Sequence, residues 1–299
     1  MDERVRVTVV VPTYNRARTL EACLQALSIQ TLDRNEYEVL VVDDGSRDGT
    51  LQVCESAKRK IARLRVHQQP NRGPAAARNA GWQRAEAGIV AFTDDDCAPP
   101  REWLAQILAP FDADPALAGV GGVMITPVGD WVPLSHHSDL TSPGAADYSR
   151  FIGTNNAAYR RNVLEAVGGF DERFRHVSVE DAELYIRVSR IGRTLIDPSL
   201  YVVHPARRMR FAEALKGYVR FYNGYVALKK IYPDEFARIY GASPERAVLK
   251  GRSWRRRAAL YLPGMVSHPW LAVQFLAYLG LSRTAVMALA LANKVRTAS

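Results

Sequence analysis

Three aspartates stand side by side at Asp94, Asp95 and Asp96, directly after the apolar stretch 89–92 and just before two prolines. Adjacent carboxylates repel one another, so the arrangement calls for a positive partner. Alternate side chains of an extended chain face the same way, which would place Asp94 and Asp96 together. Paired carboxylates suit Mg²⁺ or Mn²⁺, and such metals usually bring phosphates with them. A solvated turn that leads into a helix is the alternative use of these residues.

Further polar clusters follow other apolar runs and complete the parts of a nucleotide pocket. An aromatic ring at Tyr14 can stack on a base, and a carboxylate at Asp43 can accept a hydrogen bond from a base or ribose. Arginines near a helix start can meet phosphate groups. Each piece alone also fits a turn or a surface, and only the set in this order outweighs that alternative. The predicted nucleotide-binding residues are Thr13, Tyr14, Arg16, Asp43, Asp44, Arg72, Arg78, Asp94 and Asp95.

The elements that must position these residues alternate along the first third of the chain. We predict strands over 5–15, 37–46, 64–69 and 89–94, with helices over 16–30, 48–64 and 73–88. Such a series forms a mostly parallel sheet with helices on both faces, a Rossmann-like α/β fold. Ligands of these sheets bind beyond the carboxyl ends of the strands, where the polar clusters lie.

The pattern becomes less regular after residue 118. A Gly-rich strand over 119–128 and a loop over 129–150 precede a strand, a helix and a Gly-Gly stop over 151–174. A helix with acids in its first turn follows over 178–192, and a strand pair over 194–205 closes the core. We therefore predict two domains, 1–205 and 206–299, of which the second is a helical extension.

Charge separates the two predicted domains. The whole chain of 299 residues is 47% hydrophobic and carries a net charge of +9, but residues 206–299 hold 17 lysines and arginines against four acidic residues. A basic segment of this kind favours a polyanionic neighbour. Arginines beside interfacial aromatics, such as Arg255 beside Trp254, indicate peripheral contact with a membrane. A helical subdomain that packs on the core, or on a second copy of the chain in a homodimer, is the alternative.

Other function classes find little support in the sequence. The three cysteines form no Cys-x-x-Cys pair, which argues against a zinc site and favours a reducing compartment. The first residues lack the pattern of a signal peptide, and the apolar pieces near the C-terminus are too short to span a bilayer. No nucleic-acid-binding module is recognisable. We expect a cytoplasmic protein, located at the inner face of the membrane if the basic segment binds lipid.

The motifs occur in an order that resembles glycosyltransferase family 2, whose members have the GT-A fold. The resemblance covers about residues 5–205, through "VVVPTYNR", "EVLVVDDGSRDGT", "AFTDDDC", "GTNNAAYRRNVLEAVGGFDERF" and "VEDAELYIRV". It implies a nucleotide-sugar donor, such as a UDP-, GDP- or dTDP-sugar, and Mn²⁺ or Mg²⁺ as cofactor. The acceptor would be a glycan, a lipid-linked sugar or a small molecule.

The resemblance also assigns roles by matching positions. Thr13, Tyr14 and Asp43 would contact the nucleobase, and Arg78 a phosphate or the base. Asp96 would be the direct metal ligand, with Asp94 nearer the ribose. His204 stands where some members contact the metal or the diphosphate, although a packed strand-end histidine is the alternative. Asp181 would be the general base, and Asn155, Asn156 and Glu180 would line the sugar site.

The resemblance and these residues together imply a metal-dependent, inverting hexosyltransferase that modifies a cell-envelope polysaccharide, a glycolipid or a secondary metabolite. We expect Glu180 and partial burial to raise the pKa of Asp181, which makes it a better base. One base without an enzyme nucleophile implies single displacement and inversion. A sugar-phosphate nucleotidyltransferase is an alternative, but "PTYNRART" lacks the glycines that it would need. A non-catalytic glycan- or nucleotide-binding relative is another, against which Asp96 and Asp181 together argue.

Overall fold

The computed structural model describes residues 5–125, 151–174, 179–205, 211–241 and 243–244. They divide into two compact units. The first holds the described residues from 5 to 204 except Val179, and the second holds the two helices that follow. The division between domains that we predict at residue 205 stays a prediction.

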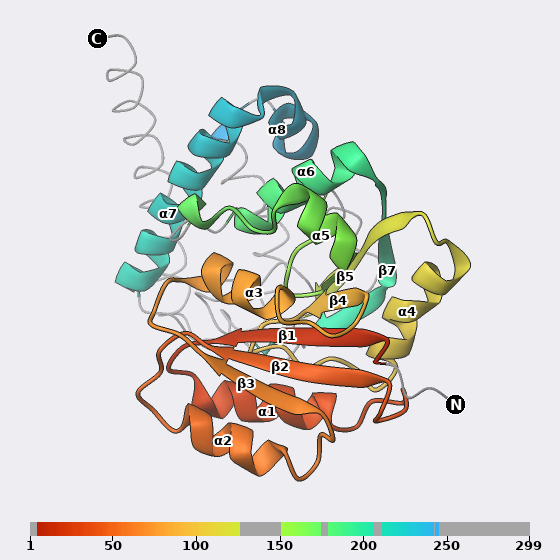
Figure 1. Ribbon diagram of the computed structural model, residues 1–299. Helices are drawn as coiled ribbons and strands as arrows, with labels where there is room; N and C mark the ends of the chain where they lie inside the picture. The colour runs from red at the N-terminus through yellow and green to blue at the C-terminus, as the bar shows by residue number, and fades with distance from the viewer. Residues whose placement is uncertain (1–4, 126–150, 175–178, 206–210, 242, 245–299) are drawn as a thin grey trace, which may run out of the picture. The chain divides into compact units, whose positions relative to one another are not determined.

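The first unit is built on one seven-stranded sheet with the order β3-β2-β1-β4-β6-β5-β7 (Figure 1). Neighbouring strands run parallel except β6, which is antiparallel to both β4 and β5. This confirms the predicted α/β class with a mostly parallel sheet. The strands are β1 (Val7–Thr13), β2 (Tyr37–Asp43), β3 (Leu64–Gln68), β4 (Ile89–Phe92), β5 (Leu117–Ile125), β6 (Ala157–Arg160) and β7 (Arg193–Val203).

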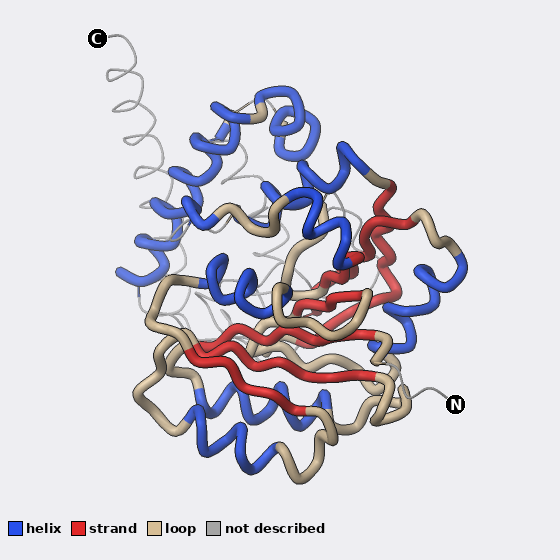
Figure 2. Tube along the Cα trace, viewed as in Figure 1, coloured by secondary structure: helices blue, strands red, loops and turns tan. Residues whose placement is uncertain are grey.

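Helices follow most of the strands, so strand and helix alternate along the chain (Figure 2). Helices α1 and α2 lie together on one side of strands β1–β3, and α3 lies on the other side (Figure 1). The helices of this unit are α1 (Ala17–Leu27), α2 (Thr50–Ala57), α3 (Pro74–Trp82), α4 (Trp103–Ala113), α5 (Arg161–Val167) and α6 (Glu180–Ile191), with a 3₁₀ turn η1 (Glu172–Phe174) between the last two.

Burial explains why the sequences of β1 and β2 are mostly apolar. Every residue of β2 is buried, and β1 is buried except at Pro12. Strands covered on both faces need apolar side chains on both, hence the continuous β-branched runs. On α1, in contrast, the buried Leu20 and Leu24 follow the helical spacing of a single apolar face.

The core beneath α3 and α6 is partly aromatic. Phe92 of β4 meets Phe170 edge-on, with ring centroids 5.3 Å apart, and Tyr159 of β6 lies 6.4 Å from Phe92. Leu184 and Val188 of α6 belong to the same buried cluster. This packing fixes the segment around Phe170 and helix α6 against the sheet.

Several elements differ from the prediction. Helix α2 ends at Ala57 instead of near residue 64, because the chain turns there and buries Ile61. The predicted strand pair 194–205 is the single strand β7. Helix α4, which contains Pro110, was not predicted. The predicted loop 129–150 lies outside the described residues.

The second unit contains α7 (Phe211–Ile231) and α8 (Pro233–Tyr240), which pack through aromatic rings. Tyr225 of α7 lies with its ring centroid 4.6 Å from that of Tyr240 and 6.1 Å from that of Phe236. In the described part of the chain, no helix combines the length and apolar character that crossing a membrane requires. The arginines and aromatics of the predicted membrane contact, from residue 252 onward, lie outside the described residues.

Close packing of α3 on β1 yields a prediction for Gly81. A Cβ atom at Gly81 would lie 2.3 Å from Val10 Cγ1, so alanine cannot fit without a shift of the helix or strand. The gain in helix propensity is about 1 kcal/mol, whereas overpacking costs roughly 1–3 kcal/mol. We therefore expect Gly81→Ala to lower the melting temperature. Gly88→Ala is the control, because its Cβ would meet nothing within 4 Å; an unchanged melting temperature for Gly81→Ala would contradict this packing.

Candidate active site

The polar residues predicted to follow the strands, which include Thr13, Asp43 and the aspartates 94–96, do meet at one edge of the sheet. Strands β1 and β2 are in register with Thr13 opposite Asp43, and Asp44 N donates to Thr13 O at 2.9 Å. Thr13 Oγ1 donates to Asp95 Oδ2 at 2.7 Å, which ties the end of β1 to the aspartates after β4. The structure thus brings the strand ends together as parallel strands require.

Two of the three aspartates share one arginine. Arg16 Nη1 lies 2.9 Å from Asp95 Oδ1, and Arg16 Nη2 donates to Asp96 Oδ2. His204, at the end of β7, places Nε2 3.2 Å from the same Asp96 oxygen. Thus Arg16 pairs with the carboxylates, where the prediction placed it on the nucleotide.

Burial and charge act in opposite directions on these acids. Burial raises the pKa of Asp95 to about 7, although Arg16 and the hydroxyl of Thr13 oppose it. Burial would also raise the pKa of Asp96, but the hydrogen bond from His204 and the charge of Arg16 outweigh it and hold that pKa well below its usual range. Asp96 is therefore an anion at neutral pH, as a metal ligand must be.

The third aspartate is held by Arg78, which also reaches α6. Arg78 is 5% exposed, and its Nη2 donates to Asp94 Oδ1 at 2.8 Å while Nη1 donates to Glu180 Oε1 at 3.1 Å. The guanidinium also lies over the ring of Phe170, 5.8 Å from its centroid. The phosphate or base contact of Arg78 stays a prediction; in the structure its guanidinium is buried between two carboxylates. The same contacts bring the aspartate cluster and the start of α6 together.

The predicted general base follows Glu180 on α6. Asp181 is partly exposed, and its Oδ1 accepts a hydrogen bond from Ala182 N at 2.7 Å. Burial and the charge of Glu180 raise the pKa of Asp181 to about 7, against the opposing charge of Arg78. Both causes were expected from the sequence. A carboxylate with this pKa is a much stronger base than a free aspartate.

Only one of the two predicted sugar-site asparagines faces this region. A Cβ atom at Gly153 would lie 3.3 Å from Asn155 Oδ1 and 3.7 Å from Asp181 Oδ2, so these two side chains flank Gly153. Gly153 has no predicted role, although it belongs to the motif segment "GTNN". The absence of a side chain there leaves room beside Asp181.

Asn156 is the exception and requires a correction. It is fully buried and joins α4 to two strands: its Oδ1 accepts from Trp103 Nε1 at 2.8 Å, and its Nδ2 donates to Val123 O and Leu200 O at 3.0 Å. These contacts stabilise the packing of the sheet. We therefore no longer assign Asn156 to sugar binding.

The two acids at the end of β2 mainly hold the loops that follow β2 and β3. Asp44 accepts hydrogen bonds from Gln69 Nε2, Arg72 N and Gly73 N, each at 2.8 Å. Asp43 accepts from Ser46 N at 2.8 Å. The side chain of Arg72 points elsewhere and pairs with Glu172 at 2.7 Å, in an exposed ion pair.

Tyr14 remains open for the predicted stacking. Its side chain is 46% exposed at the end of β1, beside the buried Thr13. A large ring in this position costs hydrophobic free energy unless something covers it. An aromatic ring at a ligand-binding sheet edge suits a nucleobase.

The donor atoms fit a metal that is shared with a substrate. Among the described residues, no group of three or more histidines, cysteines, aspartates and glutamates is arranged to hold an ion. Asp96 and His204 nevertheless place an oxygen and a nitrogen ligand side by side, both largely buried. Two protein ligands leave most of the coordination sphere to phosphate oxygens, which is how Mg²⁺ commonly binds in nucleotide sites.

Comparisons with known proteins place the chain in a family. The family described as "Glycosyl transferase family 2" matches residues 8–169. The chain is 30% identical over 236 residues to glycosyltransferase AglE of Haloferax volcanii, covering 74% of this chain and 73% of that one. It is 32% identical over 249 residues to pre-mycofactocin glycosyltransferase of Mycobacterium tuberculosis, covering 77% of this chain but only 49% of that one.

A solved structure shares the fold. The mannosyltransferase PcManGT of Pyrobaculum calidifontis, in complex with GDP-Man and Mn²⁺, superposes with a TM-score of 0.66 at 23% identity, over 97% of this chain and 87% of that one. At this identity the likeness shows the fold alone. The predicted GT-A fold is thereby confirmed.

The buried position of Arg78 generates a stability prediction. Arg78→Met leaves two carboxylates without their cation, and removing one partner of a buried ion pair costs about 3–5 kcal/mol. We expect urea unfolding to show a loss of this size, against little change for Arg59→Met, whose side chain is exposed. A loss below about 1 kcal/mol would contradict the buried bridge.

Proposed function

Because the chain belongs to glycosyl transferase family 2, we propose that it is a metal-dependent, inverting glycosyltransferase acting on a nucleoside-diphosphate sugar. One observation carries the proposal. A single buried guanidinium, that of Arg78, contacts both the aspartate cluster at the sheet edge and the residue before Asp181. Groups suited to the donor and to the acceptor therefore lie on two sides of one site.

The donor side binds the nucleotide. Tyr14 stacks on the base, and the buried carboxylate of Asp43 accepts a hydrogen bond from a base N–H at the end of β2. Asp96 and His204 would hold Mn²⁺ or Mg²⁺, which when bound would supply Lewis-acid stabilisation of the leaving diphosphate. Arg16, which neutralises Asp95 and Asp96, keeps these acids together at the sheet edge.

The acceptor side removes a proton. Asp181 accepts it from the attacking hydroxyl, and Asn155 beside it donates a hydrogen bond to a sugar hydroxyl. A positioned base contributes typically 10²–10⁴-fold to the rate. With Asp181 as base, the hydroxyl attacks the anomeric carbon directly as the bond from that carbon to the nucleoside diphosphate breaks, and the configuration there inverts.

Donor and acceptor are proposed by class. PcManGT binds GDP-Man, which supports a nucleoside-diphosphate hexose as donor. The two curated relatives are glycosyltransferases, one of which acts on pre-mycofactocin by its name. We propose a glycan, lipid-linked or small-molecule acceptor of the cell envelope or of secondary metabolism, reached at an anionic membrane surface through the basic segment 206–299.

The base assignment is tested by Asp181→Asn. The amide cannot accept the proton, so we expect release of nucleoside diphosphate to fall at least about 100-fold, with donor binding almost unchanged. The donor is first selected by thermal-shift screening of UDP-, GDP- and dTDP-sugars with Mn²⁺. Asp33→Asn, in an exposed loop, serves as the control. An active Asp181→Asn variant would show that another group is the base.

The pH dependence tests the raised pKa of Asp181. Only the ionised carboxylate accepts a proton, so kcat should fall as the pH drops below about 7. Glu180→Gln removes the neighbouring negative charge and so lowers the pKa of Asp181. The acidic limb of the pH profile, where kcat falls, should therefore move to lower pH. A limb that stays in place or moves to higher pH in Glu180→Gln would contradict the assignment.

A further inference from the structure

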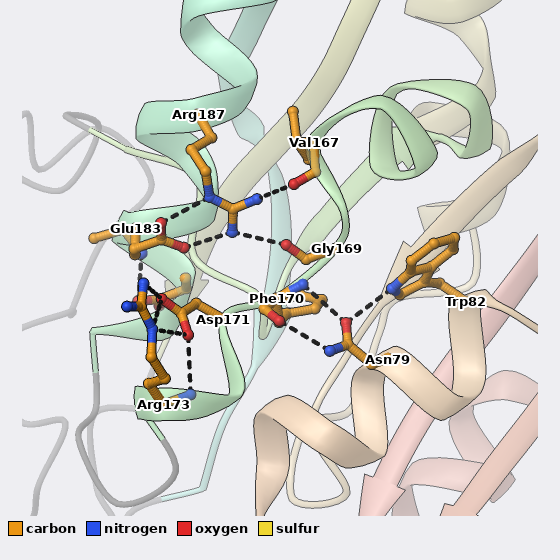
Figure 3. A network of polar contacts seen from close by, with 11 residues as sticks. Asn79, Trp82, Val167, Gly169, Phe170, Asp171, Arg173, Glu183 and Arg187 are labelled. Atoms are coloured by element: carbon orange, nitrogen blue, oxygen red, sulfur yellow. Dashed lines mark hydrogen bonds and ion pairs between the residues drawn. The ribbon is translucent and has the colours of Figure 1, made fainter.

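The side-chain amide of Asn79 is buried, and all its hydrogen-bonding groups have partners (Figure 3). Most of these partners lie in the turn around Phe170 that follows helix α5. Asn79 Nδ2 donates to Phe170 O at 2.9 Å and to Glu172 Oε1 at 3.0 Å. Its Oδ1 accepts from Phe170 N at 2.8 Å and from Trp82 Nε1 at 2.9 Å. Asn79 therefore holds both backbone groups of Phe170 to helix α3.

The same turn is held from the other side by Arg187 of α6 (Figure 3). Arg187 donates to Val167 O at 2.6 Å and to Gly169 O at 2.7 Å. It also binds both carboxylate oxygens of Glu183, one turn earlier on α6, at 2.7 and 2.5 Å. The bidentate pair with Glu183 fixes the orientation of the guanidinium that binds the turn.

The turn itself admits little variation. Helix α5 ends at Gly168, and both Gly168 and Gly169 have positive φ, at 77° and 67°. A Cβ atom at Gly169 would lie 2.5 Å from Trp82 Nε1 and 2.6 Å from Asn79 Oδ1. The backbone thus approaches α3 as closely as a residue without a side chain allows.

We propose that Asn79 and Arg187 are positioning residues that clamp the turn Val167–Phe170 between α3 and α6, and thereby place Asp181 opposite Asp94. The proposal rests on the function proposed above. Neither residue touches the reacting groups; each acts through the turn and the first two turns of α6. Glu183 lies two positions after Asp181, so a shift of the clamp moves the base with it.

The clamp complements the ionic bridge made by the preceding residue. Arg78 and Asn79 are neighbours on α3, where consecutive side chains leave the helix about 100° apart. Arg78 reaches Glu180 directly, through charges, whereas Asn79 reaches α6 through the turn, by way of neutral hydrogen bonds and Arg187. This second route reaches α6 without passing through Asp94 or Glu180.

The same network makes a third connection, through Glu172, which contributes less to stability. Glu172 joins Asn79 to Arg72 in the loop that surrounds Asp44. The side chains of Arg72 and Glu172 are 59% and 39% exposed, and exposed ion pairs contribute little to stability. A buried polar group left without a partner costs more than such a pair contributes, so the effect of Asn79 dominates.

The test compares Asn79→Ala and Arg187→Met with Thr8→Val. Thr8→Val is the control, because it likewise removes a buried polar group, a hydroxyl that donates to Glu38 and accepts from Ala87 N. Thr8 lies at the end of β1 opposite to the site. In the full-length protein we expect both clamp variants to lower kcat about 10-fold or more, with the KM for the donor within about twofold and the pH midpoint unmoved. Misplacement by about 1 Å can cost 10²-fold. Arg187→Lys, which keeps the charge but loses the bidentate pair, should recover part of kcat.

Hydrogen exchange gives a readout that needs no substrate. Amides at the start of α6, residues 181–186, should exchange faster in the clamp variants than in Thr8→Val, because the turn no longer holds the helix. If Asn79→Ala does not fold, the two Arg187 variants decide both measurements. Unchanged exchange together with unchanged kcat would overturn the clamp.

Asp181→Asn in the same assays separates this proposal from the proposed function. An inactive Asp181→Asn beside fully active clamp variants would leave the function standing and overturn the clamp. An active Asp181→Asn would refute the base, and exchange at 181–186 alone would then decide whether the clamp exists.

Discussion

One buried guanidinium governs the arrangement of this site. Arg78 binds Asp94 on one side and Glu180 on the other, and so joins the end of β4 to the start of α6. Two acids this close would repel each other in a medium that excludes water, and the cation between them makes their approach favourable. The rest of the site depends on this contact, because it sets where Asp181 stands relative to the aspartate cluster.

The acids of the site differ in charge state because their neighbours differ. Asp96, beside His204 and Arg16, has a lowered pKa and stays ionised, as a ligand for a cation must. Asp181, half-buried and next to Glu180, has a raised pKa and can take up a proton near neutral pH. One site thus provides both a stable anion and a base, and transfer from a nucleotide sugar requires both.

The strand ends were predictable from sequence, and the partners of the charges were not. Continuous β-branched runs that end in polar clusters placed Thr13, Asp43 and the aspartates at one edge, since parallel strands end together. The sequence shows that Arg78 is charged but not that two acids bury it, so it was assigned to the nucleotide. The same holds for Asn156, whose amide serves the sheet. Likewise, no local sequence pattern predicts that β6 runs antiparallel, because the register and direction of a strand are set by tertiary packing.

The convergence of Asp94 and Glu180 on one cation is tested most directly by a double-mutant cycle in urea unfolding. Asp94→Asn and Glu180→Gln are made singly and together, at pH 8, where the acids of the native site are ionised to the greatest extent. Shared contact with Arg78 predicts a coupling free energy of about 0.5–3 kcal/mol between the two substitutions. Additive effects, with a coupling indistinguishable from zero, would mean that the two carboxylates do not share a site.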